Sequence, residues 1–230
     1  MTTKPTLSII IPIYNEKTTI RKILEKIQTQ EIPKEIIIID DGSTDGTREI
    51  IQNINYPNIK KIFLKKNYGK SAAIRCGIKR VEGKITLIQD ADLEYSPNDY
   101  HKLIDPIIQN KTRVVYGTRF PRKRRPKNIS LFYLGIKLLT LITNILYKTK
   151  LTDEATCYKV FDTKLLKSIN LKSRRFEFCP EVTAKLSKKG HKIMEIPVYY
   201  NPRSKKHGKK IRYRDGISAI ATLIKYKFVD

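Results

Sequence analysis

The sequence of 230 residues contains no tryptophan and only three cysteines, Cys76, Cys157 and Cys179. Three thiols form an odd set, and their spacing matches no metal site, so the sequence predicts neither a disulfide framework nor a zinc centre. The amino-terminal residues 1–5 lack a basic stretch followed by an apolar core, so we expect no secretory signal. These absences favour a protein that is made and kept in the reducing cytoplasm.

Acidic residues are also scarce, because 22 Asp and Glu face 47 Lys and Arg. Residues 1–116 carry 19 basic and 14 acidic side chains, whereas residues 117–230 carry 28 and 8. The second half should therefore face an anionic partner. Nucleic acid is a remote alternative, since the chain lacks zinc-finger spacing and a recognisable RNA-binding signature, and its basic residues flank an apolar segment. An anionic membrane surface fits better, and no nucleic acid is expected.

Apolar runs alternate with helical patterns along the first half of the chain. This alternation predicts an α/β fold in which helices cover a mostly parallel sheet, within a single domain. Ligands of such sheets bind beyond the carboxyl ends of the strands. We expect strands at 6–13, 35–40, 59–64, 85–90 and 112–117 and helices at 17–30, 44–54, 71–82 and 97–110, with Asn15 and Asp45 capping the first two helices.

Two carboxylates, Asp90 and Asp92, stand one residue apart just after the apolar run 85–88. Such a pair can hold a hard divalent cation and leave coordination positions open for a diphosphate. Taken alone, the pair is more typical of a solvated turn than of a metal site. Polar and acidic clusters at 12–16 and 40–47 follow two other expected strands, and this shared placement favours a site at the strand ends.

Six short motifs occur in a fixed order, and together they resemble those of the family 2 glycosyltransferases, in particular the branch similar to dolichol-phosphate mannose synthase. The resemblance covers almost the whole chain and implies the GT-A nucleotide-sugar-binding fold. It divides the single domain 1–230 into a nucleotide-sugar-binding half, 1–118, and an acceptor and membrane-facing half, 119–230. The motifs are Pro12-x-Tyr14-Asn15-Glu16, Asp40 through Thr47, Asn67 through Lys70, Asp90-Ala91-Asp92, Gly117-Thr118-Arg119, and Asp153 through Lys159.

The resemblance implies a role for each of several residues. Asp90 would lie near the ribose or the sugar, and Asp92 would bind a divalent cation, Mg²⁺ or Mn²⁺, that bridges the diphosphate. Glu94 stands where the branch often has Gln and is expected to help bind the metal. Lys70 either contacts the donor or is solvated, and Tyr14 either binds the donor or packs. The positions that match those holding the base and ribose are Pro12, Tyr14, Glu16 and Asp40.

The acceptor is expected to be a polyprenyl phosphate, dolichyl or undecaprenyl. No tryptophan-rich segment with its catalytic carboxylate is present, and an anionic phosphate needs no general base. We expect Arg119, Arg203, Lys209 and Lys210 to hold phosphates, although Arg119 could instead pair with a core carboxylate. The activity implied is an inverting, metal-dependent transfer of mannose or glucose from GDP-mannose or UDP-glucose. Transfer to a sugar or protein hydroxyl is the alternative.

Segment 129–147 is the strongest membrane candidate, with Ser130, Lys137 and Asn144 forming a narrow polar stripe between basic flanks. Together with a second amphipathic pattern at 215–228, it predicts helices that lie in the membrane interface. The alternative is that either apolar stripe packs on the protein's own sheet. The expected location is peripheral, on the cytoplasmic face of a membrane, and a membrane-embedded partner subunit is compatible with it.

Overall fold

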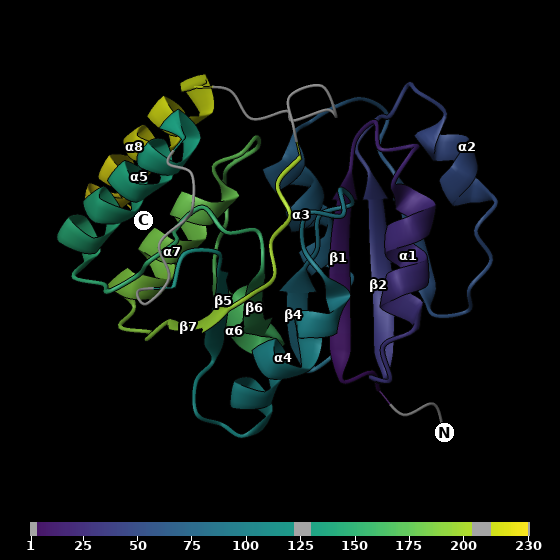
Figure 1. Cartoon of the computed structure of the whole chain (residues 1–230), viewed down its shortest axis with the longest axis horizontal. Coiled ribbons are helices and arrows are strands. Elements are labelled where there is room, and N and C mark those ends of the chain that lie inside the picture. The colour runs from purple at the N-terminus through teal and green to yellow at the C-terminus, as the bar shows by residue number, and fades with distance from the viewer. Residues whose placement is uncertain (1–3, 122–129, 204–212, 230) are drawn as a thin grey trace.

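The computed structural model describes residues 4–121, 130–203 and 213–229. Its described strands form one seven-stranded sheet in the order β3-β2-β1-β4-β6-β5-β7 (Figure 1). The first four strands are parallel, β6 runs antiparallel to both β4 and β5, and β5 is parallel to β7. The strands are β1 Leu7–Ile13, β2 Lys34–Asp40, β3 Ile59–Phe63, β4 Ile85–Ile88, β5 Val114–Thr118, β6 Lys159–Asp162 and β7 Met194–Pro197.

The helices confirm the predicted α/β alternation and add a carboxy-terminal group. Helix α3 packs on β1 and β2, α4 packs on β5 and β6, and α5, α7 and α8 pack on one another. Figure 1 shows this last group at one end of the molecule and α1 and α2 at the other. The helices are α1 Ile20–Gln28, α2 Thr47–Gln52, α3 Lys70–Ile78, α4 Tyr100–Ile108, preceded by a 3₁₀ turn at Pro97–Asp99, α5 Leu131–Tyr147, α6 Thr163–Ser168, α7 Phe178–Lys188 and α8 Tyr213–Phe228.

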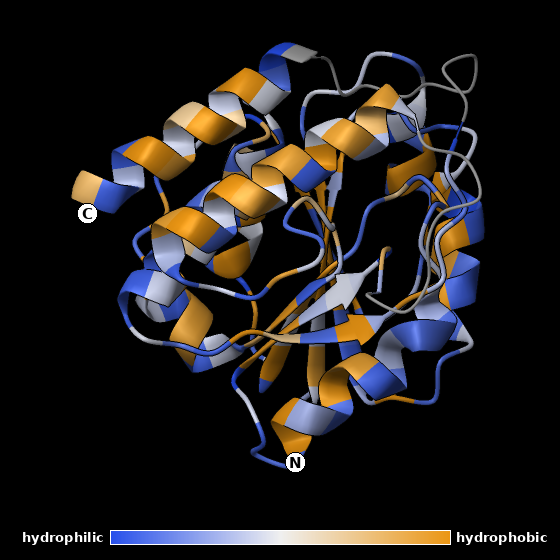
Figure 2. Ribbon diagram, turned by 60° about the vertical axis from the view of Figure 1, so that its left-hand side comes forward, coloured by the Kyte–Doolittle hydropathy of each residue, from blue (hydrophilic) through white to orange (hydrophobic). Residues whose placement is uncertain are grey.

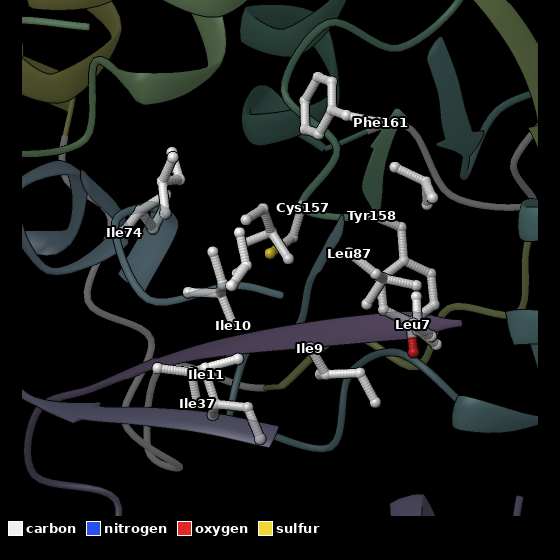
Figure 3. Packing of buried hydrophobic residues seen from close by; sticks show 14 of the residues in the cluster. Leu7, Ile9, Ile10, Ile11, Ile37, Ile74, Leu87, Cys157, Tyr158 and Phe161 are labelled. Carbon is white, nitrogen blue, oxygen red and sulfur yellow. The ribbon is translucent and has the colours of Figure 1, made fainter. Parts of the chain in front are cut away.

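The core is built from isoleucine-rich strands that are buried on both faces, as parallel strands covered by helices must be. Every residue of β1 is buried, and so is every residue of β2 after Lys34. Figure 3 shows Ile9, Ile10 and Ile37 among these buried side chains. This close packing holds the carboxyl ends of β1, β2 and β4 at one edge of the sheet, where the polar clusters follow them.

The predicted capping roles of Asn15 and Asp45 are wrong in detail. Helix α1 begins at Ile20 with Thr19 as its N-cap, whereas Asn15 adopts a left-handed φ of 53° that an asparagine tolerates. Its Oδ1 instead accepts the Thr44 N–H at 2.8 Å and so ties the end of β1 to the following turn. Gly46 is the N-cap of α2. Asp45, the residue before this N-cap, accepts the Thr47 N–H at 3.0 Å.

Helices α5 and α8 lie side by side (Figure 2), and both carry exposed apolar side chains. The predicted polar stripe of α5 faces the protein: Lys137 Nζ donates to the Thr152 carbonyl at 2.8 Å, and the Asn144 amide bonds the backbone of Leu151. The exposed face of α5 lies beside that stripe and is apolar, with Leu134, Leu138 and Leu141 more than half exposed. Among the described residues, no helix is both long and apolar enough to cross a membrane.

Candidate active site

The end of β4 carries a half-buried ion pair. Lys70, the first residue of α3, places Nζ 2.5 Å from Asp90 Oδ1. Burial alone would raise the pKa of Asp90, but the neighbouring ammonium outweighs it and holds that pKa below its usual range. Lys70, for which the sequence allowed a solvated role, is therefore drawn to the predicted carboxylate.

A second group joins three carboxylates through one arginine. The Arg203 guanidinium lies 3.0 Å from Asp92 Oδ2 and 3.1 Å from Glu16 Oε2, and its Nε lies 3.7 Å from Glu94 Oε1. Burial and the nearby Asp90 and Glu94 raise the pKa of Asp92 to about 7, although Arg203 opposes the shift. The contact joins residues 111 positions apart, and no sequence pattern predicted it.

Glu94 is held in place by the segment before Arg203. Its Oε1 accepts the Arg203 backbone N–H at 2.9 Å, and its Oε2 accepts the Tyr200 hydroxyl at 3.0 Å. The Glu94 carbonyl accepts the Asn201 N–H at 2.8 Å. Segment 200–203 therefore closes over the acidic turn at residues 90–94.

Two residues that sequence reasoning missed set the geometry of the site. Gln89, fully buried, accepts the hydroxyls of Tyr100 and Tyr158 at 2.7 Å each and donates to the Asp90 carbonyl at 2.8 Å. Asp41 accepts the N–H groups of Tyr68 and Gly69 at 2.8 Å each, which positions the start of α3 and hence Lys70. No sequence signal singles out Gln89, because its tyrosine partners lie 11 and 69 positions away and meet it only in the folded chain.

The other residues predicted to bind the nucleotide sugar lie at the same sheet edge, outside the group of carboxylates around Arg203. Asp40 is fully buried, and its oxygens accept the Ser43 N–H at 3.0 Å and the Arg48 Nε–H at 2.7 Å. Pro12 is buried within β1, in register with Ile39, and Tyr14 is half-buried just beyond the strand. Their contacts with a base or ribose stay predictions.

Arg119 lies in a buried ion pair. Its Nε and Nη2 donate to the two carboxylate oxygens of Asp153 at 2.7 Å each, and the two side chains are 5% and 0% exposed. Its guanidinium also lies 5.1 Å from the centre of the Tyr200 ring. The alternative in which Arg119 pairs with a core carboxylate is thus observed, and a contact with the acceptor phosphate stays a prediction that requires this pair to open. Lys209 and Lys210 lie outside the described residues.

The acidic turn fits a divalent cation in part. Within the described residues, no group of three or more His, Cys, Asp or Glu side chains is arranged to hold a metal. Magnesium, however, is commonly held by one or two carboxylates together with water and substrate phosphates. Asp92 and Glu94 are hard oxygen donors, and both already attract one cation, the Arg203 guanidinium. Their chemistry suits the predicted ion.

A buried carboxyl group stands apart from this cluster. Glu154 is fully buried and, within the described residues, neither of its carboxylate oxygens makes a hydrogen bond of ordinary geometry. Burial raises its pKa from 4.5 to about 7, against the opposing influence of Lys159. The folded protein is therefore more stable when this carboxyl group is protonated.

Replacing Glu154 with Gln should make the free energy of unfolding less dependent on pH. Because the folded-state pKa is raised, the stabilisation from Glu154 is complete below about pH 4.5 and is lost as the pH rises through about 7. We expect the variant to gain up to about 3 kcal/mol over wild type at pH 8, measured by urea unfolding at several pH values.

The matched control is Glu181→Gln, which removes a buried glutamate whose pKa is shifted in the opposite direction. Glu181 accepts the N–H groups of Lys172 and Ser173 and the Lys185 ammonium, and its pKa is lowered, since these bonds outweigh burial. This variant should lose stability, most of all above pH 4.5. A Glu154→Gln curve parallel to wild type across this range would contradict the assignment.

The mostly parallel seven-stranded sheet covered by helices is an α/β fold of the GT-A class. Residues 8–169 match the family model described as Glycosyl transferase family 2, and the chain belongs to that family. It is 29% identical over 237 residues to a dolichyl-phosphate beta-glucosyltransferase from Trichomonas vaginalis, covering 95% of this chain and 72% of the relative. It is 31% identical over 210 residues to a UDP-N-acetylglucosamine–dolichyl-phosphate N-acetylglucosaminyltransferase from Methanococcus voltae, covering 83% of each.

Solved structures share the fold at lower identity. Glucosyl-3-phosphoglycerate synthase from Mycobacterium tuberculosis, in complex with UDP, superposes with a TM-score of 0.75 at 16% identity, covering 98% of this chain and 81% of that one. A mannosyltransferase from Pyrobaculum calidifontis, in complex with GDP-Man and Mn²⁺, superposes with a TM-score of 0.59 at 20% identity, covering 85% and 56%. These likenesses confirm the predicted fold class.

Proposed function

We propose that this protein transfers a hexose, mannose or glucose, from a nucleotide diphosphate sugar to a polyprenyl phosphate. The carrying observation is the group at the strand edge, where Asp90 pairs with Lys70 and Glu16, Asp92 and Glu94 surround Arg203, in a chain of family 2. The polyprenyl acceptor is supported by the names of the two relatives and by the exposed apolar face of α5 and α8.

On the donor side, the charges suit a diphosphate. Asp92 with Glu94 would hold Mg²⁺ or Mn²⁺, which when bound neutralises the leaving diphosphate. Arg203 is a bidentate cation beside them and can turn from the carboxylates to phosphate oxygens. Asp90, kept ionised by Lys70, offers an acceptor for sugar or ribose hydroxyls. Lys70 and Arg203 thus lie where negative charge would develop on the leaving diphosphate.

On the acceptor side, an anionic phosphate oxygen attacks the anomeric carbon from the face opposite the diphosphate. The new bond from carbon to the phosphate oxygen forms as the bond to the diphosphate breaks, so the nucleoside diphosphate leaves and the configuration is inverted. No proton has to be removed from a phosphate that is already ionised. The protein's task is therefore to orient the two phosphates and to exclude water.

The test is a matrix of donors and acceptors. GDP-mannose, UDP-glucose and related donors, each with magnesium or manganese, are offered to a short polyprenyl phosphate and to hydroxyl acceptors. Product that extracts into organic solvent and depends on the phosphate of the acceptor supports the proposal. Transfer to hydroxyl acceptors with none to the polyprenyl phosphate would replace it with the hydroxyl-acceptor alternative.

We also propose attachment to the cytoplasmic face of a membrane through α5 and α8. High salt should weaken binding to anionic liposomes without abolishing it, because apolar burial persists when screening removes the electrostatic part. Leu138→Gln with Leu141→Gln should reduce binding at high salt, whereas Ile108→Gln with Met194→Gln should not. Complete release of wild type at moderate salt would contradict insertion. The exposed large apolar side chains of α5 and α8 are Leu131, Leu134, Leu138, Leu141, Ile145, Ile217, Ile224 and Phe228.

A further inference from the structure

A cavity of about 340 Å³ lies between segment 172–177 and helix α8, away from the acidic group. That volume is within the range of small-ligand pockets. Segment 172–177 leads into α7, and α8 packs on α7, so both walls belong to the carboxy-terminal group of helices in Figure 1. The lining residues are Lys172, Ser173, Arg174, Arg175, Glu177, Ser218, Thr222, Lys225 and Tyr226.

The lining is strongly positive, with four basic side chains and one acidic one. The Glu177 carboxylate is already engaged, because it accepts the Ser218 hydroxyl at 2.8 Å and the Arg175 N–H at 3.0 Å. Arg174 and Arg175 are exposed, and no hydrogen bond or ion pair of their guanidinium groups occurs within the described part of the chain. Exposed guanidinium groups that make no such contact are suited to bind a phosphate through paired N–H donors.

The backbone beneath these arginines is fixed. The Arg174 carbonyl accepts the Ala72 N–H at 2.9 Å, and the Arg175 carbonyl accepts the Ser71 N–H at 2.7 Å. A Cβ added to Gly69, whose φ is 100°, would overlap the Arg174 carbonyl. The segment is therefore held against the start of α3, and a ligand would not have to order it.

The cavity also borders the exposed apolar face of α8. Ile217, Ile224 and Phe228 are 64%, 48% and 81% exposed, whereas Ser218, Thr222 and Lys225 line the cavity. At 3.6 residues per turn, the two sets occupy neighbouring sides of the helix, roughly 100° apart. An anion in the cavity would thus lie beside an apolar surface that also includes the exposed leucines of α5.

We propose that this cavity binds the phosphate of an anionic membrane lipid headgroup, whose acyl chains lie along the exposed face of α8. The site is separate from the donor carboxylates. It fixes the protein on the membrane by one lipid, in addition to general attraction between a basic protein and an anionic surface. The charge of the lining selects a phosphate, and the adjoining apolar stripe selects a lipid over a free anion.

The test is binding to vesicles that contain neither nucleotide sugar nor polyprenyl phosphate, so its outcome does not depend on the proposed activity. Vesicles of phosphatidylcholine alone are compared with vesicles in which a third of the lipid is phosphatidylglycerol. The variant is Arg174→Gln with Arg175→Gln and Lys225→Gln. Its affinity for the anionic vesicles should fall by about tenfold to a hundredfold, and its weak binding to phosphatidylcholine should not change.

The matched control removes three positive charges from α1, at the other end of the molecule in Figure 1. Arg21→Gln with Lys22→Gln and Lys26→Gln should change binding by less than about threefold, since these exposed residues lie away from α5 and α8. Circular dichroism and thermal unfolding check that both triple variants are folded. Lys225→Gln alone, on a separate element, keeps the test available if the triple variant does not fold.

Three results would overturn the proposal. An equal loss for the cavity and α1 variants would leave only general electrostatic attraction. Competition by millimolar inorganic phosphate at constant ionic strength would assign the cavity to a free anion instead of a lipid. Retention of random RNA by wild type, lost in the cavity variant alone, would assign it to nucleic acid.

Discussion

Asp92→Ala is expected to lower kcat/KM for sugar transfer by about a thousandfold or more. The loss has two physical sources: a hard oxygen ligand for the predicted cation disappears, and the Arg203 guanidinium loses one of its three carboxylate partners. Stability should not fall, because the pKa of Asp92 is raised to about 7 and its negative charge therefore disfavours the folded state at higher pH. Initial rates over a range of metal and donor concentrations provide the measurement.

The matched control is Asp105→Ala, which removes an exposed carboxylate from α4. It should retain the wild-type rate. Glu94→Gln should be mild, since an amide still offers an oxygen and can keep partners in Tyr200 and Arg203. Should Asp92→Ala lose only a few-fold in rate, with its metal dependence intact, Asp92 would have to be removed from the metal site.

The order of strands and helices in the first half of the chain and the acidic sheet edge could be predicted, because both depend on local patterns. Runs such as 7–13 and 36–39 are continuous and rich in isoleucine, as buried parallel strands are, and each ends in polar residues. Strand β6, Lys159–Asp162, was not predicted. Its four residues give too short a pattern, and its place between β4 and β5 is set by antiparallel pairing that only the folded sheet defines.

The contacts within the site depended on distant parts of the chain. Asp92 and Glu94 were readable as a motif, but the approach of Arg203 was not, because it comes from a segment beyond β7. The polar stripe of α5 was also readable, yet its direction was not. Lys137 and Asn144 turn inward to the backbone at 151–152, which leaves leucines outside. Periodicity identifies a face of a helix and does not say what covers it.

Arg119→Ala is expected to lower the free energy of unfolding by about 3–5 kcal/mol, because it leaves the fully buried Asp153 without its cation. Arg119→Lys keeps the charge but loses the bidentate geometry and should cost about 1–2 kcal/mol. The loss should also loosen Tyr200, which lies against Arg119 and donates to Glu94. Urea unfolding of each variant gives these values.

The double variant Arg119→Ala with Asp153→Ala separates folding from catalysis. With both charges gone, most of the stability lost in Arg119→Ala should return, since the uncompensated carboxylate is absent. Arg119→Lys, assayed where it is folded, then tests the predicted phosphate contact. A raised KM for polyprenyl phosphate with unchanged donor affinity would place Arg119 on the acceptor. Equal KM values for wild type and Arg119→Lys would restrict Arg119 to holding the end of β5 against Asp153, and the acceptor phosphate would have to be held by other cations.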